Sequence, residues 1–169
     1  MENHQPDLGL GLAPNATLIL ARITEPSTND LQLIVAEAKR QSEAVSTILG
    51  PANPVVPDAS SRGFELTWRN YVAYVVRNES YCQQEPGEPS PSGRIGTHRH
   101  DSAFLTYVAT TTFATDEYPG PLTQWFINAD WHCIDVVSDT GPEIRELTPE
   151  VLKRLLAELD APVTTYDRL

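Results

Sequence analysis

Residues 64–82 read FELTWRNYVAYVVRNESYC, a long apolar alternation interrupted by the polar pair Arg69–Asn70. Asn tolerates the positive φ of a tight turn, so the pair predicts a β-hairpin loop between strands at residues 64–69 and 71–82. Cross-strand partners share a face, which makes one side of the hairpin wholly apolar and places it in the core. That face would hold Phe64, Leu66, Trp68, Tyr71, Ala73 and Val75.

The second predicted strand is apolar on its other side as well, through Val72, Tyr74 and Val76. A strand that is apolar on both faces is usually central in its sheet and covered twice. Toward the end of this strand the core-side positions turn polar. They are Arg77, Glu79 and Tyr81, which indicates the rim of the core or a structural ion pair, with a functional site as the alternative.

The rest of the chain predicts three further strands and three helices. Runs of β-branched and aliphatic residues predict strands at residues 17–23, 122–128 and 131–138, the last two joined by a turn at residues 128–130. Helical spacing of apolar residues after several possible N-caps predicts a helix at residues 30–49. Asp101 or Ser102 caps a helix at residues 102–112, and the start Thr148-Pro149-Glu150 predicts a helix at residues 149–160.

These elements indicate an α+β fold, in which about three helices pack on a mainly antiparallel sheet of four to five strands. The chain of 169 residues fits one domain at residues 15–169 after a flexible lead at residues 1–14. Residues 83–96 hold several prolines and glycines and almost no apolar side chain, which predicts a long mobile loop that could serve as a lid.

The charge of the chain bears on its partners. Twelve Lys and Arg against 23 Asp and Glu give a net charge of −11, spread along the chain. Such a surface repels phosphate-rich partners, so we expect neither nucleic acid nor an anionic membrane surface as a partner. A basic protein would be attracted, although acidity also serves solubility alone.

Cysteine usage and the N-terminal sequence bear on the compartment. Cys82 and Cys133 lie in predicted strands without the spacing of a metal motif. We expect buried reduced thiols rather than a disulfide, which favours the cytoplasm. The first 14 residues contain no basic region and no sustained apolar run, so the sequence predicts neither a signal peptide nor a membrane span.

Four residues are candidate catalytic groups: Glu79, His98, His100 and Asp135. Acidic side chains on strands can act as a general acid or base, and His titrates near neutral pH. A nucleophile triad of Ser102, His100 and Asp135 is conceivable, but no GxSxG motif is present. A second set, expected to bind a ligand or partner, comprises Arg77, Asn78, Tyr81, Trp131 and His132.

The sequence His98-Arg99-His100-Asp101 also bears on metal binding. On an extended segment both histidines point the same way and could share a metal ion. Further ligands could come from Glu79, His132, Cys133 or Asp135, but the spacing matches no complete metal motif. Histidines beside a flexible loop are more often solvated or hydrogen-bonded at a helix start, so we expect no metal and no cofactor.

A pattern across residues 60–147 resembles a group of small bacterial proteins of unassigned function. The residues that carry the resemblance are Trp68, Tyr71-Val72, Tyr74, Val76, Asn78-Glu79-Ser80-Tyr81, Ser102, Phe104-Leu105, Tyr107-Val108, Ile134-Asp135-Val136 and Pro142. The resemblance implies a common α+β domain and no particular activity.

Two functions remain open from the sequence. Acidity and the absence of a complete catalytic motif favour a small acidic intracellular binding protein, of which an immunity-type protein that neutralises a basic protein partner is one form. The alternative is an enzyme with a small pocket that uses Glu79, His98, His100, His132 or Asp135 as acid, base or metal ligand.

Overall fold

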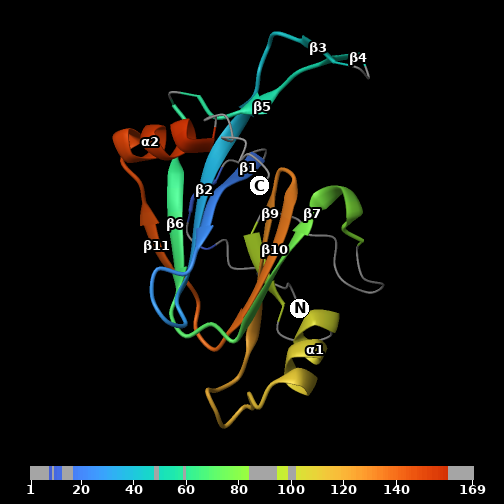
Figure 1. Cartoon of the computed structure of the whole chain (residues 1–169), viewed down its shortest axis with the longest axis vertical. Helices are drawn as coiled ribbons and strands as arrows, with labels where there is room; N and C mark the ends of the chain where they lie inside the picture. The colour runs from blue at the N-terminus through green and yellow to red at the C-terminus, as the bar shows by residue number, and fades with distance from the viewer. Residues whose placement is uncertain are drawn as a thin grey trace, which may run out of the picture.

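The computed structural model describes residues 8, 10–12, 17–47, 50–58, 60–83, 95–98 and 102–159. These residues form two antiparallel sheets stacked face to face (Figure 1). The first, called the β6 sheet, has the order β1-β2-β6-β11, and β5 pairs with the end of β2. Its strands are β1 (Thr17–Thr24), β2 (Leu31–Arg40), β5 (Val55–Val56), β6 (Gly63–Trp68) and β11 (Glu143–Glu146).

The second sheet, called the β10 sheet, has the order β7-β10-β9-β8. Its strands are β7 (Ala73–Asn78), β8 (Ile95–His98), β9 (Thr123–Ala129) and β10 (His132–Ser138). A separate hairpin of β3 (Val45–Thr47) and β4 (Gly50–Ala52) projects from one end of the molecule (Figure 1).

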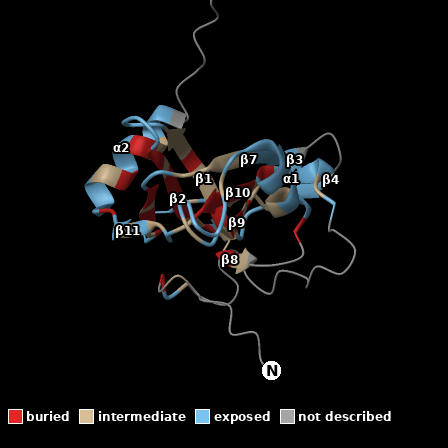
Figure 2. Cartoon of the chain, turned by 90° about the horizontal axis from the view of Figure 1, so that it is seen from below, coloured by how far each residue is buried: buried red, intermediate tan, exposed pale blue. Residues whose placement is uncertain are grey.

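The core fills the space between the two sheets. Apolar side chains from facing strands form one buried cluster, which makes the sheets mutually dependent. Figure 2 shows buried residues gathered where the strands of the two sheets overlap. The β6 sheet contributes Leu18, Leu31, Leu33, Val35, Phe64, Leu66 and Trp68, and the β10 sheet contributes Ile95, Ile127, Ala129, Ile134 and Val136.

Each sheet carries one helix on its outer face. α2 (Pro149–Leu159) covers the β6 sheet, where Leu155 packs with Ala21 and Ile34 in a second buried cluster. A Cβ atom at Gly63 would lie 2.6 Å from Leu152 Cδ1, so a larger residue there would require the buried Leu152 side chain to shift. α1 (Ala103–Thr111) lies against β9, with Val108 fully buried.

The predicted hairpin at residues 64–82 is wrong. β6 pairs with β2 and β11, whereas β7 pairs with β10, so the two strands belong to different sheets. The chain crosses between the sheets after Trp68, through Asn70 at φ 54°. Phe64, Leu66 and Trp68 do share a core with Tyr71, but across the space between two sheets rather than across a hairpin. Ala73 and Val75 were predicted on the wrong face, because Tyr74 is the β7 residue that packs on this core and its neighbours in the strand point the other way.

The predicted helix at residues 30–49 is also wrong. β2 is an extended strand with strand neighbours on both sides, β1 and β6. Leu31, Leu33 and Val35 alternate into the core between the sheets, while Ile34 faces α2. A strand buried on both faces carries apolar residues at nearly every position, and that pattern includes the i, i+3, i+4 spacing of a helix.

The expected central strand at residues 71–82 lies at an edge. β7 has one strand neighbour, β10, and Val76 is 38% exposed. Apolar residues on both sides of β7 therefore do not reflect double covering. After Asn78 the chain turns into a 3₁₀ turn, η1 (Glu79–Tyr81), instead of continuing as a strand.

Several expectations are confirmed, and several strands were missed. The strand at residues 17–23 and the helices at residues 102–112 and 149–160 are present, and Ser102 is the N-cap that accepts from the amides of Phe104 and Leu105. The second hairpin is present as β9 and β10, but its loop is Asp130–Trp131, shifted from residues 128–130. β3, β4, β5, β8 and β11 were not predicted. The described residues form a mostly antiparallel, sheet-rich α+β fold with two helices rather than about three.

Part of the expected flexible lead packs on the core. Leu10 is buried and Leu8 and Leu12 are partly buried against the same cluster. Arg62 holds this segment, because its guanidinium donates to the backbone carbonyls of Leu10 and Gly11 at 3.3 and 2.9 Å. The described part of the predicted loop at residues 83–96 is limited to residues 83, 95 and 96, and the last two belong to β8.

The buried indole of Trp68 allows a test of the core. Replacing Trp68 by Ala should lower the free energy of unfolding by about 3–5 kcal/mol, the range for buried large aromatic residues. Trp68→Phe should cost far less, because the indole N–H has no hydrogen-bond partner among the described residues. Urea unfolding of the three proteins measures both values. Equal losses in the two variants would contradict this account of the core.

A second test uses the pair Glu37–Arg62. Arg62 donates to both carboxylate oxygens of Glu37, at 2.7 and 3.2 Å, and these hydrogen bonds lower the pKa of Glu37 below its ordinary 4.5. A lowered folded-state pKa stabilises the fold above the ordinary pKa, and this stabilisation is lost as the pH falls through the lowered value. Glu37→Gln should therefore reduce stability at pH 7 and flatten its decline below about pH 4.5. Thermal unfolding between pH 7 and pH 2 measures this, and parallel curves for the two proteins would argue against it.

Candidate functional site

Four polar side chains form a hydrogen-bonded network on the outer face of the β10 sheet, in which Ser102, Gln124 and Asp135 are buried and Arg77 is exposed. Ser102, the N-cap of α1, donates from Oγ to Gln124 Oε1 on β9. Gln124 in turn donates from Nε2 to Asp135 Oδ1 on β10 at 2.7 Å. Arg77 on β7 donates from a terminal nitrogen to the other oxygen of Asp135. The network thus ties the helix to three strands of the sheet.

The network occupies both carboxylate oxygens of Asp135. Its side chain is buried, and both carboxylate oxygens accept hydrogen bonds, one of them from a cation. Burial disfavours the charged form of Arg77, but the attraction of Asp135 and the hydrogen bond between them hold the pKa of Arg77 above its ordinary value. Asp135 and Arg77 therefore form a structural ion pair, which is one of the roles that the sequence suggested for Arg77.

Five of the predicted site residues lie together at one end of the β10 sheet. Asn78 pairs with His132 in the strand register, and the Glu79 amide donates to the Trp131 carbonyl at 3.0 Å. Tyr81 and Trp131 are 84% and 69% exposed. His132 Nδ1 is buried without a hydrogen-bond partner among the described residues.

These side chains do not build an acid–base centre with the remaining candidates. Glu79 is exposed on η1, while Asp135 is engaged with Arg77 and Gln124. The backbone of His98 pairs with Gln124 in β8, and its side chain and the whole of His100 lie outside the described residues. Among the residues that the structure describes, no three His, Cys, Asp or Glu side chains are grouped to hold a metal ion.

An open hollow of about 370 Å³ lies on the outer face of the β6 sheet, beside the part that α2 covers. Its charged side chains neutralise one another. Arg145 pairs with Glu65 at 2.8 Å, and Arg69 pairs with Asp30 and with Glu143. Since each arginine already has its carboxylate, this hollow is a solvated face laced by ion pairs rather than a charged binding site.

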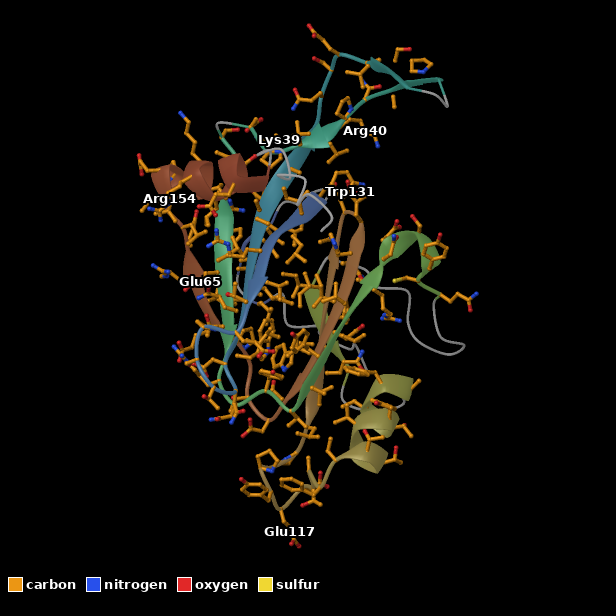
Figure 3. The ribbon with its side chains drawn as sticks, viewed as in Figure 1. Lys39, Arg40, Glu65, Glu117, Trp131 and Arg154 are labelled. Carbon is orange, nitrogen blue, oxygen red and sulfur yellow. The ribbon has the colours of Figure 1, made fainter. Side chains whose placement is uncertain are left out.

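Beyond α1 the chain forms a short hairpin, residues 113–118, called here the tip hairpin. Thr115 and Tyr118 exchange backbone hydrogen bonds of 2.7 and 3.1 Å, which makes Asp116 and Glu117 its two loop residues. Thr115 Oγ1 also accepts from the amides of Glu117 and Tyr118 at 3.3 and 3.2 Å. Figure 3 shows Glu117 at the extreme end of the molecule, pointing away from the sheets.

Two aromatic rings flank these acids. Phe113 and Tyr118 stack with ring centroids 6.2 Å apart and planes 13° from parallel. They are 83% and 65% exposed, so the stacked pair faces solvent. Asp116 and Glu117 lie beside a stacked aromatic pair because the turn returns Tyr118 to Phe113.

The distribution of ion pairs leaves the tip hairpin negatively charged. Six cations in the described residues are paired with carboxylates: Arg22, Lys39, Arg62, Arg69, Arg77 and Arg145. No ion pair among the described residues involves Asp116 or Glu117. Asp139 adds a carboxylate close to the tip hairpin, because its Cβ lies 3.9 Å from the place that a Cβ atom would take if Gly120 had a side chain.

Within the described part of the chain, no helix is both long and apolar enough to cross a membrane.

The structural role of Asp135 is open to a double-mutant cycle. Arg77→Leu should cost about 1–3 kcal/mol of unfolding free energy, because it leaves a buried carboxylate without its cation. Asp135→Leu in the Arg77→Leu background should recover part of that loss, since both partners are then apolar. Chemical unfolding of the two single variants and the double variant measures the coupling. Strictly additive losses would show that Arg77 and Asp135 act independently.

Comparisons with known proteins do not show a family. No protein-family model matches the chain, and no curated protein or solved structure matches it. The geometry of the described residues is therefore the basis for a functional proposal.

Proposed function

We propose that this protein binds a basic protein partner and that the tip hairpin is its contact surface. In this role the chain acts as a small acidic binding protein, of the kind that neutralises a basic toxin. The observation that carries the proposal is the stacked, exposed pair Phe113–Tyr118 beside the unpaired acids Asp116 and Glu117.

Charge supports a basic partner. The chain has a net charge of −11, and most of the described cations are held by carboxylates of the same chain. Among the described residues no cation pairs with Asp116 or Glu117, so the tip hairpin presents unpaired negative charge. Long-range attraction of this kind steers a cationic partner into an encounter and raises the association rate.

The aromatic pair supplies the short-range part of the contact. Exposed aromatic residues are enriched among the anchors of protein interfaces, where they bury a large area at low entropic cost. A Lys or Arg side chain is attracted to the face of an aromatic ring, and a neighbouring carboxylate can pair with the same cation. Phe113, Tyr118 and the two acids between them combine both features on one small surface.

The tip hairpin is also held in one conformation before binding. Its two ends are joined by the reciprocal backbone hydrogen bonds of Thr115 and Tyr118, and the Thr115 hydroxyl fixes the amides of the turn. Ala114 N donates to Thr112 Oγ1 at 3.3 Å, which anchors the hairpin to the end of α1. A surface ordered in the free protein loses less conformational entropy when a partner docks.

Removal of the tip charges tests the proposal. The double variant Asp116→Asn, Glu117→Gln should associate with the basic partner about three- to tenfold more slowly than the wild type, because two steering charges are lost. The partner is recovered by a pull-down from the host lysate at about 0.1 M and about 1 M salt, where the Debye length falls from about 10 to about 3 Å. Association rates are then measured with the purified partner.

The matched control is Glu146→Gln, Glu150→Gln. It removes two exposed acids near the start of α2, away from the tip hairpin, and changes the net charge equally. Equal slowing by both double variants would indicate non-specific attraction to the whole surface. In contrast, Phe113→Ala with Tyr118→Ala should raise the dissociation rate about tenfold or more while the association rate changes little. An unchanged dissociation rate would show that the tip hairpin is not part of the contact surface.

A further inference from the structure

Two cysteines that are far apart in the sequence lie at the same end of the β10 sheet. Cys82 follows η1, and its amide donates to the Glu79 carbonyl at 3.0 Å. This turn brings Cys82 Sγ to 3.5 Å from the carbonyl oxygen of Asn78. Asn78 pairs with His132, the residue before Cys133, so the strand register brings both thiols to one place.

The two thiols are close enough to interact. The Cys82 thiol raises the pKa of Cys133, and both cysteines are free and partly buried. Arg77 lies opposite Cys133 in the strand register. It is close enough to both cysteines for the negative charge of either thiolate to raise the pKa of Arg77. The arrangement therefore places two sulfurs and one cation at the edge of a sheet, where β7 turns into η1.

We propose that Cys82 and Cys133 form a thiol–disulfide site that reacts with small disulfides such as oxidised glutathione. The Cys82 thiolate attacks one sulfur of oxidised glutathione, forming a mixed disulfide and releasing one glutathione thiolate, which takes up the proton that Cys82 gave up. Cys133, as its thiolate, then attacks Cys82 Sγ and releases the second glutathione. In balance, two protein S–H bonds are lost, one S–S bond forms, and one oxidised glutathione is reduced to two thiols.

The surroundings of the thiols set the order of the two steps. Burial first, and then the neighbouring Cys82 thiol, raise the pKa of Cys133 to about 12, so Cys133 is a poor initial nucleophile. Arg77 acts against burial and lowers the pKa of Cys133. In the mixed disulfide, the Cys82 sulfur and the Cys133 thiol belong to the same chain, so the second attack is intramolecular.

The product would join η1 to β10 covalently. The bond closes a loop from Cys82 to Cys133, 133 − 82 = 51 positions along the chain. Closing a loop of this length restricts the unfolded chain, so the oxidised protein should unfold at a higher temperature than the reduced one.

The test uses the full chain, first reduced and then incubated under native conditions with oxidised glutathione. Free thiols are alkylated, and peptides are mapped by mass spectrometry without reduction. The expected result is a monomer in which the peptides of Cys82 and Cys133 are linked and no glutathione remains. Cys133→Ser should stop at glutathione bound to Cys82, and Cys82→Ser should leave Cys133 largely unmodified.

Other outcomes would overturn the proposal. Stable glutathione on both cysteines, or a disulfide between two chains, would show that the sulfurs do not react with each other. Full alkylation of both cysteines after the incubation would show that the site does not react with a small disulfide. Because the wild-type peptide map decides the matter by itself, a folding defect in either serine variant would not leave the proposal untested.

Discussion

Burial of apolar side chains between the two sheets is the constraint on which the other features depend. Each sheet has few strands, and neither buries its inner face without the other. The crossing after Trp68 is therefore essential, because it carries the chain from the β6 sheet to the β10 sheet. Glu25 stabilises this crossing, because its carboxylate accepts hydrogen bonds from the hydroxyls of Tyr71 and Tyr74 at 2.8 and 3.1 Å.

Local signals in the sequence were sufficient where an element is defined by its own residues. The cap Ser102, the start Thr148-Pro149 and the turn between β9 and β10 all place their elements correctly or within one residue. The apolar pattern alone predicted the wrong element where the structure of a segment depends on neighbours that are distant in the sequence. β2 was taken for a helix because strands on both sides and α2 above it bury nearly every residue. The sequence of one strand does not reveal which sheet it joins.

The candidate site was also predicted only in part, and the missed residues are those whose role depends on distant segments of the chain. The sequence located Arg77 and Asp135 as polar residues among apolar strands, and a structural ion pair was one of the expected explanations. Gln124 was missed, because its role depends on the register that brings β9 beside β10. The tip hairpin was missed as a surface, since the stacking of Phe113 on Tyr118 requires a turn that composition does not specify.

The positions of β7 and β11 at the ends of their sheets have a consequence for association between copies of the chain. The outer edge of such a strand presents backbone groups that can pair with another strand. β11 has only four residues, and Glu143, Arg145 and Glu146 place charges along it. β7 carries the exposed apolar side chain of Val76, and its pairing length ends where the chain turns at Asn78. Charge and a length of four residues thus guard β11 against edge-to-edge polymerisation, whereas β7, with six residues, is limited only by the turn that follows Asn78.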